Sequence, residues 1–265
     1  MTADQPKPKP SAPRSGGGRA VAKKPLPPGQ RPLQFALLAL AAATLWHASI
    51  ALYAGLGYGL SADLRDRLYT GMATAPERAA LKRARMDILT VWNAWLPYDD
   101  LAQITLADAV EAGIGRPRGR AMMPEVMRLE AEALRRNPAN AYAWARLAYA
   151  RYVYNGPSRL VTEPLLQSIL SAPYEPQLMA SRIVLALKTE KYWPPELRAL
   201  FPEQLRRAWL RNSVETVHAA YQDGIEHLLR EKLAGDRVKR AHFDALLADI
   251  APSVSGVNRG TGAHP

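Results

Sequence analysis

The first clear pattern along the chain is an apolar stretch without any charged side chain, from Pro32 to Ala62. Its interior consists mainly of Ala, Leu and Gly. A bilayer core about 30 Å thick needs about 20 helical residues, and this stretch is long enough to cross it. The apolar region of a cleaved signal peptide has only about 7–15 residues. We therefore predict an uncleaved transmembrane helix over residues 33–60.

Beyond this segment the apolar positions recur with helical spacing, and alternating runs typical of strands are nearly absent from the sequence. Thr74 and Glu77 have the spacing of a capping box, which predicts a helix that continues until Pro97 ends it. A second helix is expected over residues 99–111, with Asp99 as its N-cap. Gly and Pro residues then predict an exposed loop at 113–120. The predicted class is all-α.

Short helices separated by tight breaks follow between Met122 and Lys191. They are expected over residues 125–136, 140–154, 159–171 and 175–188, with Pro164 interrupting the third. This pattern describes stacked antiparallel helix pairs. A long helix over 203–233 and a last helix over 237–250 complete an exported all-α domain, 63–250, before a disordered tail, 251–265. The apolar stripe of the long helix fits a packing face of the domain or a dimerising coil, so the oligomeric state stays open.

The segment from Ala133 to Trp144, continued by Leu147, Ala148 and Tyr152, resembles the junction between two tetratricopeptide repeats. In that family a proline precedes a helix that carries Trp, Leu, a small residue and Tyr at these spacings. A weaker copy follows 35 residues later, where Pro173 corresponds to Pro138 and Met179 to Trp144. Arg182 falls where Leu147 would repeat, and a third copy of the repeat is not recognisable in the sequence. The resemblance covers residues 122–191 and implies helical hairpins; an unrelated helical bundle is the alternative.

Composition separates the N-terminal tail from the rest of the chain. Residues 1–31 are rich in proline and carry seven basic residues against one acidic residue, Asp4. The tail therefore holds +6 of the formal charge of +11, which leaves +5 for everything after it. This predicts a disordered tail that is attracted to anionic lipid, and no nucleic-acid partner. A solvated tether and a ligand for a cytoplasmic groove are both compatible with its prolines.

The charge asymmetry also predicts orientation, because basic flanks stay on the cytoplasmic side. The tail is expected in the cytoplasm and the helical domain outside it. The Arg- and Ala-rich composition suggests a bacterial protein, so the expected location is the inner membrane with a periplasmic domain.

Catalytic patterns are poor in this sequence. The chain has no cysteine, which excludes thiol catalysis, thiolate metal sites and disulfides. His218 and His227 are too far apart for a helical zinc pair, and Glu215 beside His218 fits a surface ion pair better than a ligand set. We predict no enzyme, no cofactor, no metal and no catalytic residue.

The sequence carries clearer signals for binding other proteins than for catalysis. The resemblance implies a concave groove lined by the first helix of each pair, where partner proteins or peptides bind. Tyr142, Arg146 and Tyr149 are predicted to face it, although the tyrosines could instead pack against the preceding hairpin. The loop arginines could meet an acidic partner or lipid headgroups, or be solvated. These are Arg116, Arg118 and Arg120.

Small residues recur every four positions along the predicted transmembrane helix, and they surround one histidine. Such a ridge lets another helix approach closely, and a histidine near mid-membrane suggests a buried polar contact. An Ala-rich helix with an incidental histidine is the alternative. The predicted packing residues are Ala43, His47, Ala51, Gly55 and Gly59.

These features together predict a single-pass membrane scaffold or adaptor that contacts other proteins of a bacterial envelope complex. Cell-surface polysaccharide assembly is one setting, suggested by analogy alone. A small subunit of a larger membrane machine, held mainly by its transmembrane helix, is one alternative. An envelope hydrolase acting on glycan or peptide is another.

Overall fold

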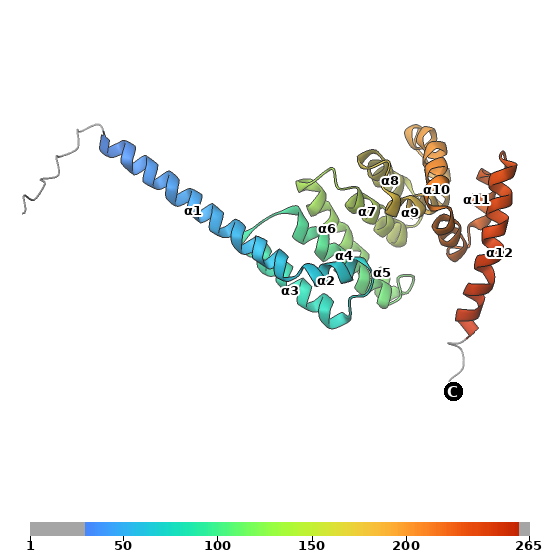
Figure 1. Cartoon of the computed structure of the whole chain (residues 1–265), viewed down its shortest axis with the longest axis horizontal. Helices are drawn as coiled ribbons and strands as arrows, with labels where there is room; N and C mark the ends of the chain where they lie inside the picture. Colours follow the sequence, from blue (N-terminus) through green and yellow to red (C-terminus); the bar gives the residue numbers. More distant parts are fainter. Residues whose placement is uncertain (1–29, 260–265) are drawn as a thin grey trace, which may run out of the picture. The chain divides into compact units, whose positions relative to one another are not determined.

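The computed structural model describes residues 30–259, and within that range every regular element is a helix (Figure 1). This confirms the all-α class and the order of an apolar N-terminal helix followed by a helical domain. The predicted tail over residues 1–31 lies outside the described residues, except that Gln30 and Arg31 begin the first helix. Residues 260–265 of the predicted C-terminal tail also lie outside them.

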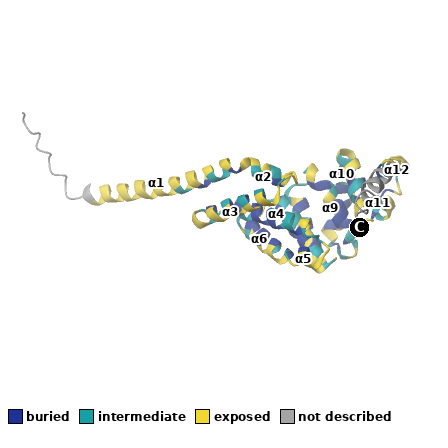
Figure 2. Ribbon diagram, turned by 90° about the horizontal axis from the view of Figure 1, so that it is seen from below, coloured by how far each residue is buried: buried dark blue, intermediate teal, exposed yellow. Residues whose placement is uncertain are grey.

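Helix α1, Gln30–Leu60, contains the predicted membrane segment. Its stretch Pro32–Leu60 is long and apolar enough to cross a membrane, and most of its side chains are exposed (Figure 2). The hydroxyls of Thr44 and Ser49 each donate to the carbonyl four residues earlier, at 2.8 Å. These bonds satisfy the hydroxyls within the helix, as an apolar environment requires.

The chain divides into two compact units, Met1–Ser49 and Ile50–Pro265. The second unit contains the last turns of α1 and all later helices. These are α2 (Ala62–Tyr69), α3 (Ala75–Val91), α4 (Trp95–Glu111), α5 (Pro117–Arg120), α6 (Met123–Arg136), α7 (Ala141–Asn155), α8 (Arg159–Ser171), α9 (Pro176–Lys188), the short 3₁₀ helix η1 (Glu190–Tyr192), α10 (Pro195–Gln222), α11 (Glu226–Lys232) and α12 (Arg237–Arg259).

Consecutive helix pairs make up the centre of the second unit: α4 with α6, α7 with α8, and α9 with α10 (Figure 1). Small side chains stand where the helices approach, and Ala102, Ala133, Ala143 and Ala148 have no exposed surface. Larger apolar side chains from α8 to α12, among them Leu165 and Phe243, form the main core. Small crossing residues let the pairs stack closely.

Several predicted boundaries agree with the structure. Helices α6 to α9 match the predicted ranges to within about two residues. The capping box is present, since Thr74 N donates to Glu77 Oε2 at 2.7 Å. The prediction that Pro97 ends a helix is wrong: α3 already ends at Val91, and Pro97 lies in the first turn of α4. There a proline loses no helical hydrogen bond, because the first N–H groups have no partner inside the helix.

Other predicted boundaries are also wrong. Helix α8 runs through Pro164 without interruption. Because Pro164 has no N–H, the Leu160 carbonyl loses its helical donor, and it accepts from Arg151 Nη1 at 2.8 Å instead. The helix predicted over 203–233 begins at Pro195, bends at Asn212 and ends before Gly224, whose φ is +66°. The last helix continues to Arg259 instead of ending near residue 250.

Candidate functional site

The candidate site lies between α7 and α9, and local signals in the sequence fix both helices. Asn140 caps α7, because its Oδ1 accepts from the backbone N–H groups of Tyr142 and Ala143 at 3.1 and 3.2 Å. Helix α7 ends at Gly156, whose φ of +76° suits glycine. Pro176 opens α9 at its first position. These ends determine which side chains face the space between the two helices.

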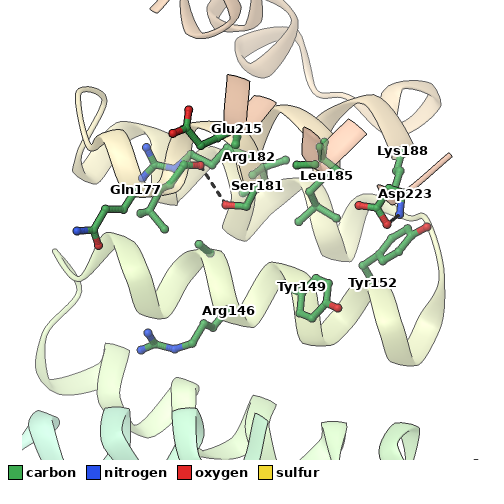
Figure 3. Close-up of a pocket in the computed structure, with 16 residues that line it drawn as sticks. Arg146, Tyr149, Tyr152, Gln177, Ser181, Arg182, Leu185, Lys188, Glu215 and Asp223 are labelled. Atoms are coloured by element: carbon green, nitrogen blue, oxygen red, sulfur yellow. Dashed lines mark hydrogen bonds and ion pairs between the residues drawn. The ribbon is translucent and has the colours of Figure 1, made fainter. Parts of the chain in front are cut away.

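A cavity of about 490 Å³ opens between α7 and α9 and extends to the second half of α10 (Figure 3). Most of its wall is aliphatic or aromatic. The main contributors are Ala145, Tyr149 and Tyr152 from α7, and Leu178, Val184 and Leu185 from α9. Its size lies within the range of about 300–1,000 Å³ that is common for ligand pockets. The wall therefore suits apolar side chains of a ligand.

Charged groups at one end of the cavity are paired. Lys188 Nζ lies 2.5 Å from Asp223 Oδ1 and 5.3 Å from the centre of the Tyr152 ring. Burial raises the pKa of Tyr149, and the carboxylate of Asp223 adds to the effect. The phenol is therefore neutral at neutral pH and available as a hydrogen-bond donor beside an apolar wall.

The three side chains predicted to face a groove are placed differently. Tyr149 lines the cavity, and about a third of it is exposed. Arg146 lines the cavity too, but its guanidinium points away from the α9 side chains in Figure 3. Tyr142 lies outside the lining, and its hydroxyl donates to Gln177 Oε1 at 3.1 Å. The structure thus brings Tyr149 fully, and Arg146 in part, to the cavity.

The Arg146 guanidinium belongs to a buried group of charges behind the cavity. It donates to Asp99 and, through Nε at 2.5 Å, to Glu130, whose side chain is completely buried. Asp99 also accepts from Asn140 Nδ2 at 2.8 Å and from the Tyr69 hydroxyl at 2.6 Å. The prediction that Asp99 caps a helix is therefore wrong: it lies inside α4, facing the core. Arg146 was predicted to face a groove, but its guanidinium packs inside the domain against Asp99 and Glu130.

A second buried group surrounds the neighbouring Asp100. Its carboxylate accepts from Arg65 Nε at 2.9 Å, from Arg85 Nε at 2.5 Å and from the Tyr69 hydroxyl at 3.2 Å. Arg85 Nη1 in turn donates to Ser61 Oγ at 2.7 Å. Since Tyr69 contacts both Asp99 and Asp100, a continuous set of polar contacts links Ser61, directly after α1, to Arg146 of helix α7.

The burial of Glu130 has an electrostatic consequence. Loss of hydration raises the pKa of Glu130 to about 8, and the nearby Asp99 carboxylate contributes in the same direction against the lowering effect of Arg146. Sequence reasoning missed Glu130 and Arg85. Both were detectable, because each occupies a position on the apolar stripe of its helix: Glu130 lies four residues from both Val126 and Leu134, and Arg85 lies between Leu81 and Ile88.

The arginines at 116, 118 and 120 are exposed, as the predicted loop requires, but residues 117–120 form the helical turn α5. Arg120 Nε donates to the Tyr154 carbonyl at 3.2 Å. Gly119 is buried against the end of α4, where an added Cβ would lie 2.4 Å from the Gly113 oxygen. The segment is thus tied to the domain rather than a free loop.

The small residues predicted as a helix-packing ridge are exposed along α1: Ala43, His47, Ala51, Gly55 and Gly59. A Cβ added at Gly55 or Gly59 would meet nothing within 4 Å. The glycine that does pack inside the second unit is Gly57, where an added Cβ would lie 3.0 Å from Ile88 Cδ1. Sequence reasoning missed this contact, because Gly57 lies between the two glycines of the four-residue pattern.

Within residues 30–259, no group of three or more His, Asp or Glu side chains is arranged to hold a metal ion. Glu215 lines the cavity, whereas His218 Nε2 lies 3.4 Å from Gln222 Nε2. No protein-family model, curated protein sequence or solved structure matches this chain. The cavity between α7 and α9 is therefore interpreted from its own geometry.

Proposed function

We propose that this chain is a single-pass protein of a bacterial inner membrane whose helical domain binds a partner protein and catalyses no reaction. The apolar, exposed helix α1 supports membrane anchoring. Residues 1–31 carry seven basic residues against one acidic residue, and this excess ahead of the apolar stretch supports a cytoplasmic N-terminus and a periplasmic domain. The domain then serves as an adaptor in an envelope complex.

The cavity between α7 and α9 is the observation that carries the binding role. In stacked helix pairs the first helices line a concave surface, and α7 and α9 are the first helices of their pairs. The tetratricopeptide-like character of these pairs is part of the proposal and rests on the sequence from Ala133 to Trp144, where the Trp144 indole donates to the Pro138 carbonyl at 2.8 Å. The partner inserts an apolar segment, with polar flanks near Lys188 and Asp223.

Site-specific photocrosslinking in native membranes tests this role. A photoreactive amino acid replaces Tyr149 in the cavity or, as a control, Tyr154 on the same helix outside the lining. The two tyrosines are 37% and 39% exposed, so general accessibility is matched. We expect a discrete adduct from position 149 that position 154 does not give. Equal labelling from both positions would contradict binding in the cavity.

A second candidate function, an accessory subunit held by its membrane helix, is favoured by the open surfaces of Gly55 and Gly59. In that case α1 alone retains the partner, and the cavity adduct is absent. The adaptor proposal requires the folded domain. Deleting residues 122–191 would not separate the two, because α6 to α9 carry much of the core.

A further inference from the structure

Helix α3 runs antiparallel to the last turns of α1. Arg85 Nη1 reaches Ser61 Oγ at 2.7 Å, and one turn back along α1 a Cβ on Gly57 would touch Ile88 Cδ1 at 3.0 Å. The C-terminal end of α3 therefore points toward the N-terminal end of these last turns of α1. Ala54, a further turn back, is only 2% exposed, so this side of α1 is covered there as well.

The length of α1 exceeds what a bilayer needs. At 1.5 Å per residue, about 20 residues cross the hydrocarbon core of about 30 Å, and counting from Leu33 places the end of the span near Leu52. The remaining turns, Tyr53–Leu60, contain the contacts with α3: Gly57 lies against Ile88, and the Arg85 guanidinium lies 5.0 Å from the centre of the Tyr58 ring. A span that ends near Leu52 stops five residues before Gly57, whose neighbour Ile88 belongs to the last turn of α3.

The outer surface of this end of α3 suits such a position. Met86 and Val91 are large apolar side chains with 54% and 46% exposure, and Trp92 is half-buried at the end of the helix. Lys82 and Arg83, further from the membrane, are exposed. Tryptophan favours the interfacial layer, and basic side chains are attracted to anionic headgroups.

We propose that the C-terminal end of α3, Met86–Trp92, lies in the interfacial layer of the membrane that α1 crosses, with phospholipid headgroups as its partner. The segment of α1 inside the hydrocarbon core is then Leu33–Leu52. This inference rests on the proposed membrane anchoring. It holds the domain against the bilayer through a second contact besides the helix itself.

The absence of cysteine from the chain allows a direct test, since every introduced cysteine is the single labelling site. The full chain is reconstituted in phospholipid nanodiscs and labelled with an environment-sensitive fluorophore. The variants are Val91→Cys and Met86→Cys at the proposed contact, Leu45→Cys inside the span, and Tyr174→Cys as a control. Leu45 and Tyr174 are both 69% exposed, which matches their accessibility in the protein itself.

Lipids that carry a spin label near the headgroup or deep in the acyl chain then quench the fluorophore. We expect headgroup-labelled lipid to reduce the emission at positions 91 and 86, deep-labelled lipid to reduce it at position 45, and neither to affect position 174. If position 45 is quenched while 91 and 86 behave like 174, the α3 contact is refuted and the anchor stands. If position 45 is not quenched either, the membrane anchoring itself fails.

Discussion

Replacing Arg146 with methionine tests whether the buried charge group holds the helix pairs together. The substitution keeps most of the apolar stem and removes the guanidinium that contacts Asp99 and Glu130. The three side chains are 11%, 4% and 0% exposed, so solvent does little to compensate either carboxylate after the change. We expect a large loss of stability with little change in shape.

The magnitude follows from what remains after the change. Breaking a buried ion pair by removing one partner costs about 3–5 kcal/mol. Two features lower the penalty here. Asp99 keeps Asn140 and Tyr69 as donors, and Glu130 carries little negative charge at neutral pH because burial already raises its pKa to about 8. We therefore expect about 3 kcal/mol of destabilisation for Arg146→Met, near the lower end of that range.

Thermal unfolding of the full chain in detergent micelles, followed by circular dichroism, measures this effect. For a domain of this size about 3 kcal/mol corresponds to a fall in Tm of about 6–12 °C. Arg128→Met is the matched control, because Arg128 pairs with Glu125 on the surface, where both side chains are about half exposed. An exposed pair is worth at most about 1 kcal/mol. Equal falls in Tm for the two variants would refute the structural role of the buried group.

Two further predictions concern single positions in the same domain. The folded-state pKa of Glu130 is raised from 4.5 to about 8, so protonation of Glu130 contributes to stability fully below pH 4.5, and this contribution is lost as the pH rises through 8. Glu130→Gln should remove up to about 5 kcal/mol of this pH dependence. Urea unfolding at several pH values measures it, and parallel curves for the two proteins would contradict the prediction. Gly119→Ala should destabilise by about 1–3 kcal/mol or more, because its Cβ would lie 2.4 Å from the Gly113 oxygen and 2.6 Å from the Ala109 oxygen. Gly115→Ala meets nothing within 4 Å and should stay within about 0.5 kcal/mol of the wild type in the same melting assay; similar values for both would show that α5 is not packed as described.

The sequence predicted the helices well where local signals determine them. The capping box at Thr74 and the breaks at Asn137 and Gly156 lie in the chain itself, so helix ends near them were predictable. Prolines misled the prediction, because the effect of a proline depends on its place in the helix. Pro97 falls in a first turn, and the carbonyl freed by Pro164 finds a side-chain donor nine residues away in sequence.

The candidate site was only partly predictable. The resemblance and the helical spacing together predicted Tyr142 and Tyr149 on one groove; Tyr149 lines the cavity, whereas Tyr142 lies outside the lining. The direction of Arg146 depends on Asp99 and Glu130, which come from other helices, and no local pattern reports contacts across 47 and 16 residues. A charged residue on an apolar stripe, as at Glu130, is the sequence signal that such buried pairs leave.

Co-purification from native membranes with Ala145→Arg shows whether a partner occupies the cavity between α7 and α9. Ala145 is half-buried and lines the cavity, so arginine there places bulk and charge in the binding space. Ala131→Arg makes the same change at an exposed position of α6 outside the lining. With both variants folded and membrane-bound, we predict that Ala145→Arg loses the partner and Ala131→Arg keeps it. Retention of the partner by Ala145→Arg would contradict the account.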